Sequence, residues 1–300
     1  MSPPDVRHEY VPVDGIRLHC ARAGAGPLVL FAHGFPEFWY AWRRQLAAFA
    51  AGHEVAAPDL RGYNLSDKPP RLEDYRVGRL VDDLRGLADH LGHRRFTLVG
   101  HDWGGVVGWA FAIAHPERLE RLVIVNAPHP GTFAREIREN PAQQAASRYM
   151  LMLRGAEAEA RLAADGFALI RERFFGDRVW KGIFDDEDRR AYLDAWGRPG
   201  ALTGGLNYYR AARVGPPSGD EAPGDGGFAM DPARLTVRVP TLVIWGEQDP
   251  ALLTGNLDGL ERFVPDLTVR RIPDGSHWVV HERPEVVNGL IREFLDPVRA

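Results

Sequence analysis

The sequence predicts an α/β fold, a mostly parallel sheet flanked by helices, with an inserted helical lid. Short apolar runs alternate with amphipathic helical patterns up to residue 127, and the alternation resumes after residue 232. This alternation is typical of right-handed crossovers between parallel strands. Residues 128–232 show only helical patterns. We therefore expect a core in two parts, 1–127 and 233–300, with a lid of residues 128–232 over the carboxyl edge of the sheet.

The first part begins with a hairpin. Val11 to Cys20 predicts two short strands that turn at Asp14-Gly15, a common hairpin dipeptide. Apolar runs and helical periodicity then predict the following elements in order: a strand at 27–31, a helix at 41–51, a strand at 54–58, a loop at 59–70, a helix at 77–91, a strand from 96, a helix at 106–114 and a strand at 122–125.

The lid is predicted from helical segments near 141–153, 157–173, 186–196 and 201–213. It ends in Val214 to Gly227, which is rich in Pro, Gly and Asp and is expected to be a mobile surface loop. The second part of the core then follows, with strands at 241–245 and 267–272, a helix between them at 257–263 and a closing helix at 284–295.

Composition excludes several classes of protein. The 300 residues carry 37 Lys and Arg against 41 Asp and Glu, and the basic residues are scattered, so we expect no nucleic-acid partner. Cys20 is the only cysteine, which excludes an intramolecular disulfide and a cysteine-rich metal site. Residues 1–10 are polar, and no apolar run approaches the ~18 residues that span a bilayer. We expect a cytoplasmic protein with no membrane partner; a homodimer stays open.

One short stretch, Gly100-His101-Asp102-Trp103-Gly104, joins an apolar strand directly to a helical pattern. Glycines on both sides of Asp102 permit the tight strand-to-helix bend of a nucleophile elbow. A carboxylate is ionised at neutral pH and can attack an sp3 carbon without a base, which gives an ester. The alternative is that Asp102 only caps the helix, a frequent role of aspartate.

An ester on Asp102 needs an activated water for its release. Asp249 follows the predicted strand at 241–245, and His277 follows the last predicted strand. The order Asp102, Asp249, His277 is that of nucleophile, acid and histidine in an α/β-hydrolase chain. Taken singly, Asp249 before Pro250 is typical of a turn, and His277 of a surface histidine.

An oxyanion hole is predicted at His33-Gly34-Phe35-Pro36, which ends the strand at 27–31. Gly34 allows the backbone to approach a bound anion, so the amides of Phe35 and Trp103 are the candidate donors to a tetrahedral intermediate. An ordinary turn at the end of a strand is the alternative for this tetrapeptide.

The sequence resembles the soluble epoxide hydrolases of the α/β-hydrolase superfamily over nearly its whole length. The elbow and the His-Gly-Phe-Pro stretch also occur in dehalogenases, so they indicate the branch of the superfamily more than the substrate. The matching motifs are His33-Gly34-Phe35-Pro36-Glu37, Trp39-Tyr40-Ala41-Trp42-Arg43, Asp59-Leu60-Arg61-Gly62-Tyr63, Gly100-His101-Asp102-Trp103-Gly104-Gly105 and Gly275-Ser276-His277-Trp278.

The resemblance implies an α/β-hydrolase fold with a cap, and two cap tyrosines whose hydroxyls hold and protonate the epoxide oxygen. Leu206-Asn207-Tyr208-Tyr209-Arg210 resembles the second tyrosine motif of the family and gives this role to Tyr209, with its neighbour Tyr208 as an alternative. Tyr149 is the candidate for the first. A neutral phenol can donate to a far more basic alkoxide. The alternative is that these tyrosines only pack.

The implied reaction has two steps and needs no cofactor or metal. Asp102 opens a small-molecule epoxide while Tyr149 and Tyr209 donate to its oxygen. Water deprotonated by His277, which Asp249 orients, then releases a vicinal diol. The lid residues Met150, Leu153 and Phe174 are expected to shape the pocket.

Three alternatives stay open. A haloalkane or haloacetate dehalogenase would use Asp102 to displace halide, with Trp103 as a donor to the halide; however, some dehalogenases carry Asn where Phe35 stands, and others Arg directly after the nucleophile. A protein of this fold could bind ligands without turnover. A metal site on His277 and His281 lacks a carboxylate pattern.

Three further residues, His101, Trp109 and His129, lie outside the predicted catalytic set. His101 and Trp109 are expected to pack around the elbow, and His129 to be exposed in a loop.

Overall fold

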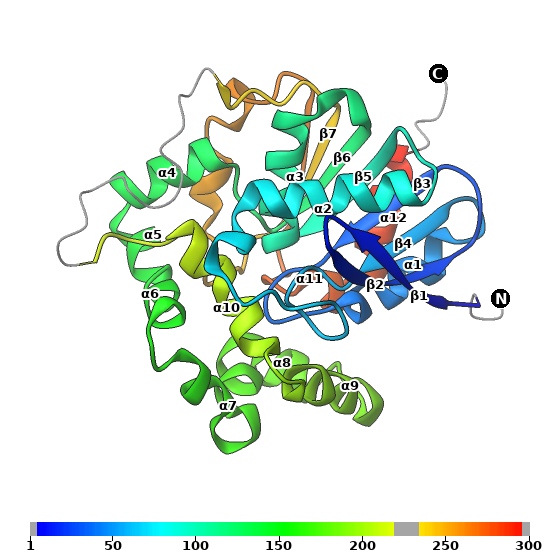
Figure 1. Cartoon of the computed structure of the whole chain (residues 1–300). Helices are drawn as coiled ribbons and strands as arrows, with labels where there is room; N and C mark the ends of the chain where they lie inside the picture. The colour runs from blue at the N-terminus through cyan, green and yellow to red at the C-terminus, as the bar shows by residue number, and fades with distance from the viewer. Residues whose placement is uncertain (1–4, 219–233, 296–300) are drawn as a thin grey trace.

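In the computed structural model, residues 5–218 and 234–295 are described, and they contain one eight-stranded sheet with helices on both faces (Figure 1). The strand order is β1-β2-β4-β3-β5-β6-β7-β8. β1 pairs with β2, and β2 with β4, in antiparallel fashion, and all later pairs are parallel, which confirms the predicted α/β-hydrolase sheet. The strands are β1 (Arg7–Val13), β2 (Ile16–Ala23), β3 (Leu28–Ala32), β4 (Glu54–Pro58), β5 (Phe96–His101), β6 (Leu119–Val125), β7 (Thr241–Gly246) and β8 (Leu267–Ile272).

Alternate side chains of the central strands enter two separate apolar cores, one on each face of the sheet. In β3, Leu28 and Leu30 belong to the core that contains residues of α2 (Val77–His90) and α3 (Trp103–Ala114). Val29 and Phe31 belong to the other core, with residues of α1 (Arg43–Phe49) and α12 (Pro284–Leu295). Because both faces are covered, these strands are apolar throughout, which is why their sequence shows runs instead of alternation.

A helical segment, residues 130–212, connects β6 to β7 and projects from the sheet (Figure 1). It is anchored to the loops at the carboxyl ends of the strands: Trp196 Nε1 donates to the Pro36 carbonyl at 2.6 Å, and Tyr208 donates to the Arg61 carbonyl at 2.9 Å. Its helices are α4 (Pro130–Glu139), α5 (Pro141–Ala146), α6 (Tyr149–Arg154), α7 (Ala158–Leu169), η4 (Ile170–Phe175), α8 (Gly176–Trp180), α9 (Asp186–Gly197) and α10 (Ala201–Ala212).

Several predicted helices differ from the structure. The segment 257–263 forms two short 3₁₀ turns, η6 (Thr254–Leu257) and η7 (Leu260–Arg262), because Gly259 between them is left-handed, with φ 75°. The segment 157–173 is broken at 164–167, where Asp165, Gly166 and Phe167 all have positive φ, and continues as the π-helical η4. The segment 141–153 is two helices, α5 and α6.

The N-terminal end of the segment 41–51 is a 3₁₀ turn, η1 (Trp39–Trp42), that precedes α1. The remaining short elements are η2 (Leu72–Tyr75), η3 (Pro116–Arg118) and α11 (Val279–Glu282). The end of the expected lid at residue 232 and residues 219–227 of the expected mobile loop lie outside the described residues.

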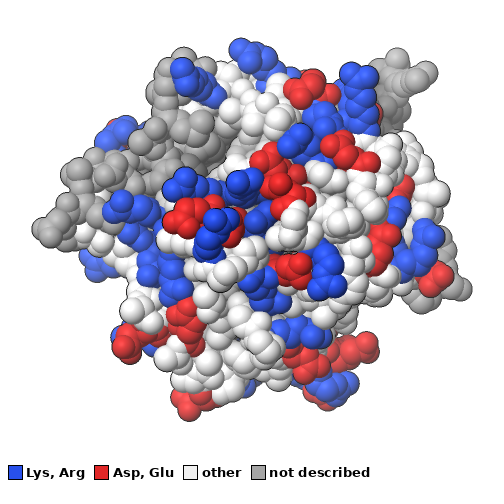
Figure 2. All heavy atoms as spheres, in the orientation of Figure 1, with Lys and Arg blue, Asp and Glu red and all other residues white. Residues whose placement is uncertain are grey.

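The surface carries both charge signs intermixed on the face shown in Figure 2. None of the helices in the two described stretches combines the length and the apolar character needed to cross a membrane.

Candidate active site

Asp102 occupies the turn between β5 and α3, with the unusual backbone angles φ 51° and ψ −121°. The turn is possible because two glycines let backbones approach closely. A Cβ on Gly100 would lie 2.3 Å from the Gly104 carbonyl oxygen, and a Cβ on Gly104 would lie 2.0 Å from the Ala32 carbonyl oxygen. Any side chain at these positions would clash with the elbow, so the glycine spacing has the steric role that the sequence predicted.

The Asp102 carboxylate does not act as a helix cap. It accepts no capping hydrogen bond within the described helix α3. Instead, Oδ1 accepts a 2.7 Å hydrogen bond from the backbone amide of Phe35. The carboxylate is nearly buried and lies at the helix N-terminus, where the helix dipole favours negative charge. The amide of Phe35 is therefore already placed beside the oxygen that would become an oxyanion.

His277 lies between two carboxylates. Its Nδ1 is 2.7 Å from Asp249 Oδ2, and its Nε2 is 3.6 Å from Asp102 Oδ2. Burial alone would lower the pKa of His277, but the charge and hydrogen bond of Asp249, helped by Asp102, outweigh it and raise that pKa to about 9. Burial raises and His277 lowers the pKa of Asp249, and the net shift is downward. Asp249 is thus a buried anion that orients the imidazole.

Asn126 holds Asp249 in place and was missed by the sequence analysis. Its Nδ2 donates to Asp249 Oδ2 at 2.9 Å, and its Oδ1 accepts from the amide of Gly246 at 2.8 Å. The other Asp249 oxygen accepts from the amides of Ala251 and Leu252. Asn126 directly follows β6, at the edge of the sheet that carries Asp102 and Asp249. Its position after a buried strand was the signal that could have found it.

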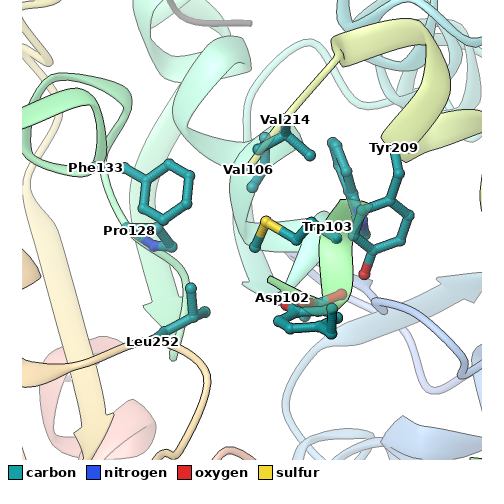
Figure 3. A pocket seen from close by; sticks show the side chains of 10 residues that line it. Asp102, Trp103, Val106, Pro128, Phe133, Tyr209, Val214 and Leu252 are labelled. Carbon is teal, nitrogen blue, oxygen red and sulfur yellow. The ribbon is translucent and has the colours of Figure 1, made fainter. Parts of the chain in front are cut away.

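The two predicted tyrosines lie together at the cavity that Asp102 lines. The rings of Tyr149 and Tyr209 are 6.5 Å apart, and Tyr209 packs edge-on against Trp103 at 5.1 Å and Phe35 at 5.5 Å. Figure 3 shows the Tyr209 hydroxyl pointing toward Asp102. Burial, reinforced by the charge of Asp102, raises the pKa of both phenols well above 10, so both are protonated donors at neutral pH.

Tyr208, the neighbour of Tyr209, points elsewhere. Its hydroxyl donates to the Arg61 carbonyl at 2.9 Å, and its ring packs against Tyr63, Tyr75 and Trp103. Its hydroxyl therefore ties α10 to the core.

A mainly apolar cavity opens from Asp102 toward the helical segment (Figure 3). Of the three predicted pocket residues, Met150 lines it, whereas Leu153 is fully buried in the apolar core and lies outside the lining. Phe174 packs edge-on against Tyr149 and Phe35 and is not among the lining residues. The lining residues are Asp102, Trp103, Val106, Pro128, Phe133, Tyr149, Met150, Tyr209, Val214 and Leu252.

The three residues outside the predicted catalytic set, His101, Trp109 and His129, are all buried. Trp109 packs as expected, and its Nε1 donates to the Ala127 carbonyl at 3.1 Å. The expectation of an exposed His129 is wrong: it is 1% exposed, its Nε2 binds the Leu235 carbonyl, and burial lowers its pKa to about 4. His129 caps α4 through its Nδ1, which accepts from the amide of Gly131, a role that the sequence did not indicate.

The ring nitrogens of His277 and His281 contact different carboxylates and are not arranged to bind one metal ion together. His277 binds Asp249, while His281 Nε2 lies 2.6 Å from Glu37 Oε1. His101, which precedes Asp102 in the chain, lies within hydrogen-bond distance of Glu37 as well. The two imidazoles of the suggested metal pair thus serve different carboxylates.

Comparison with known proteins places this chain in a family. The chain matches the alpha/beta hydrolase fold family over residues 27–284. It is 38% identical to the AB hydrolase superfamily protein YfhM of Bacillus subtilis, over 97% of this chain and 98% of that protein. It is 35% identical to epoxide hydrolase 4 of Mus musculus, over 96% of this chain and 79% of that protein.

A solved structure also resembles this chain over nearly its whole length. A mutant of an epoxide hydrolase from Bacillus megaterium, complexed with its product (R)-3-[1]naphthyloxy-propane-1,2-diol, superposes with a TM-score of 0.88 at 37% identity, over 96% of this chain and 100% of that one.

Proposed function

The chain belongs to the epoxide hydrolase family of the α/β-hydrolase superfamily, and from this we propose that it hydrolyses small-molecule epoxides to vicinal diols through an ester on Asp102. One observation supports the proposal most: the Asp102 carboxylate faces an apolar cavity between a backbone amide donor, two protonated phenols and a buried imidazole. The Bacillus megaterium relative is seen with a vicinal diol as its product.

In the first step, an Asp102 oxygen attacks an epoxide carbon. The carbon–oxygen bond of the ring breaks, and an ester forms with an alkoxide beside it. Tyr149 or Tyr209 transfers a proton to the alkoxide, while the other hydroxyl donates a hydrogen bond. The alkoxide is more basic than even these phenols, whose pKa is raised, so the transfer is downhill.

In the second step, water attacks the ester carbonyl. Esterification removes the negative charge of Asp102, which is one of the charges that raise the pKa of His277, so that pKa falls and the ring releases its proton to solvent. The neutral imidazole can then take the proton from the attacking water. The amides of Phe35 and Trp103 would stabilise the tetrahedral oxyanion. Collapse breaks the ester bond, and His277 returns its proton to the leaving alkoxide, which completes the diol. The proton set free as Asp102 returns to its anion restores the tyrosine.

The helical segment would act as a cap over this chemistry, with residues 128–232 as its bounds. It supplies Tyr149, Tyr209 and Met150 to the cavity, and its helices are fixed to the core by hydrogen bonds such as that of Trp196 to Pro36. Enclosure excludes bulk water and strengthens electrostatic interactions at Asp102.

Two other functions have less support. A dehalogenase would need a halide site beside Trp103, but the ring of Tyr209 packs edge-on against that indole, and a pair of hydroxyls suits an epoxide oxygen. A protein that only binds ligands would not need the Asn126–Asp249–His277 chain of hydrogen bonds. Halide release from haloalkanes without diol from any epoxide would favour the dehalogenase.

Single turnover in heavy-oxygen water tests the covalent route. With enzyme in excess over a terminal aryl epoxide, the first diol should be unlabelled and the label should enter the Asp102 side chain, as read by peptide mass spectrometry. Asp102→Asn, which keeps the shape of the side chain, should give neither product nor label. Label that appears directly in the first diol would overturn the ester intermediate.

A further inference from the structure

Arg178, on helix α8 of the helical segment, reaches the core near the proposed base and takes no part in the steps above. Its Nε atom is 3.0 Å from Glu282 Oε1, and its Nη2 donates to the Asp274 carbonyl at 2.7 Å. Its Nη1 donates over a longer distance, 3.4 Å, to Gln248 Oε1. One guanidinium therefore contacts the loop after β7 and the turn after β8 at the same time.

These two loops carry the proposed acid and the proposed base. Gln248 directly precedes Asp249 in the chain. Asp274 belongs to the turn that leads to His277. The amide of Gln248 also donates to the Gly275 carbonyl at 2.8 Å, so the two loops lie side by side. A guanidinium suits this place because its donors form a rigid fork that can bind several acceptors, whereas an ammonium is a point charge.

Glu282, the carboxylate that faces Arg178, holds the turn on which His277 lies. The Glu282 side chain is only 1% exposed. Its Oε2 accepts from the Ser276 amide at 2.7 Å, and its Oε1 accepts from the Ser276 hydroxyl at 3.0 Å. A buried carboxylate is stable only where hydrogen bonds and an opposite charge compensate it. Because Ser276 directly precedes His277, the contact of Arg178 with Glu282 bears on the position of the base.

The residue that follows the base contacts the same part of the helical segment. Trp278 Nε1 donates to the Phe174 carbonyl at 2.6 Å, and the Trp278 ring packs against Phe175 at 4.3 Å. Phe174 and Phe175 end the π-helical η4, and α8 follows directly. Residues 174–178 thus contact the chain on both sides of His277.

We propose that Arg178 is a positioning residue for ester hydrolysis, which orders His277 against Asp249 only while the helical segment is seated on the core. The role rests on the proposed function of His277 as the base. Arg178 is not among the residues that line the cavity at Asp102, so it acts through the loops that it contacts. A base must keep its nitrogen within hydrogen-bond reach of the attacking water, and small displacements from this geometry slow the reaction strongly.

Arg178→Gln tests the proposal through the rates of the two steps. Gln is uncharged and too short to contact both loops. Ester breakdown should slow by about 10–10²-fold, while ester formation should stay within about twofold. Stopped-flow single turnover of styrene oxide gives both rates. An unchanged rate of breakdown would overturn the proposal.

The rate of ester formation serves as an internal control for the helical segment. This segment supplies Tyr149 and Tyr209 to the cavity, so a variant in which it no longer sat on the core would also form the ester slowly. Equal slowing of both steps in Arg178→Gln would therefore show a general loss of structure and would overturn the specific role in hydrolysis.

Arg198→Gln is the matched control, because Arg198 is a second arginine by which the helical segment binds the core. Its Nε donates to Asn64 Oδ1 at 2.8 Å, and Asn64 lies in the loop after β4. Its loss should leave the ratio of the two rates unchanged. A ratio that changed as much as in Arg178→Gln would show that any weakened contact of the helical segment slows hydrolysis, and would overturn the role of Arg178.

Arg178→Lys separates the charge from the fork of donors. An ammonium can contact Glu282 or the Asp274 carbonyl, but it cannot span the whole set of acceptors. Ester breakdown in this variant should therefore remain slowed by about tenfold. A full rate with Lys would mean that a positive charge beside Glu282 is sufficient, and would overturn the bridging of the two loops.

Amide hydrogen exchange of the full chain without substrate separates this inference from the proposed function. In Arg178→Gln, the amides of Gln248 and Ser276 should exchange about tenfold faster than in the unmodified protein, and in Arg198→Gln at the unmodified rate. Unchanged exchange in Arg178→Gln would overturn the inference even if Asp102 forms its ester. Absence of the label from Asp102 in heavy-oxygen water would instead overturn the proposed function and leave the exchange result standing.

Discussion

The Nε2 atom of His277 lies 3.6 Å from the Asp102 carboxylate, beyond hydrogen-bond distance, while Nδ1 of the same ring is bound to Asp249 at 2.7 Å. The imidazole is thus hydrogen-bonded on its Asp249 side and not on its Asp102 side. A base that must bind water during ester hydrolysis needs this asymmetry, because a tight pair with Asp102 would occupy the nitrogen that accepts the proton.

Removal of the base should therefore trap the ester. In His277→Gln, Asp102 keeps its amide donor from Phe35 and both tyrosines, so ring opening should proceed while hydrolysis stops. Intact-protein mass spectrometry after exposure to styrene oxide should show one added substrate mass, located on Asp102. The double variant with Asp102→Asn is the control and should stay unmodified. An unmodified single variant would count against the ester.

Loss of the acid should change the pH dependence. The charge and hydrogen bond of Asp249 are the largest influences that raise the pKa of His277, so Asp249→Asn should lower that pKa and move the acid limb of the hydrolysis step to lower pH. The rate should also fall by about 10²–10⁴, because the imidazole loses its fixed orientation. Stopped-flow measurement of ester breakdown from pH 5 to 9 checks both effects. If the acid limb of the pH–rate profile stayed at the same pH, Asp249 would not control the pKa of His277.

The phenols should matter for ring opening and not for hydrolysis. Tyr209→Phe and Tyr149→Phe keep the aromatic packing with Trp103 and Phe174, and each should slow ester formation by about 10–10³-fold. The double variant should form almost no ester. Tyr208→Phe is the control, since its hydroxyl binds the Arg61 carbonyl and should cost stability more than rate. Equal losses of rate in all three variants would mean that the hydroxyls act through the stability of the fold and not as donors to the epoxide oxygen.

The sheet and the elbow could be predicted because their signals are local. Strand β5 is buried along its whole length and is therefore apolar, and the close contacts of the turn at Asp102 require glycines beside it, so both leave a local pattern in the sequence. The contacts of Asn126 and Glu37 could not be predicted from the sequence. Asn126 binds Asp249, which is 123 residues away, and Glu37 binds His281, which is 244 residues away, so only the fold brings each pair together. His129 was misplaced for the same reason: its partner Leu235 is 106 residues distant.

The stability of the fold should depend on pH through His277. The pKa of His277 in the folded state, about 9, is above the unfolded value of 6.5. The contribution of this residue to the free energy of unfolding is therefore full below pH 6.5 and is lost as the pH rises through 9. The difference in unfolding free energy between the unmodified protein and His277→Gln should shrink by about 2–3 kcal/mol from pH 6 to pH 9.5. Urea denaturation at both pH values measures it. A constant difference would mean that the folded pKa is not raised.

Substrate size should be set by residues that line the cavity and not by their buried neighbours. Met150 and Leu153 lie on the same helix, α6, but only Met150 faces the cavity at Asp102. Met150→Ala should therefore enlarge the cavity and raise kcat/KM for epoxides with bulky aryl groups by about tenfold relative to propylene oxide, which is worth ~1.4 kcal/mol.

Leu153→Ala is the matched control for Met150→Ala. Leu153 is fully buried, so its truncation should lower the unfolding free energy by about 3 kcal/mol and leave the ratio of kcat/KM values for the bulky and small epoxides within twofold. The two variants are compared with the same pair of substrates and with thermal unfolding. If Leu153→Ala changed the substrate ratio as much as Met150→Ala, substrate size would not be set by the lining residues alone. The buried Leu153 could have such an effect only if its truncation let helix α6 move.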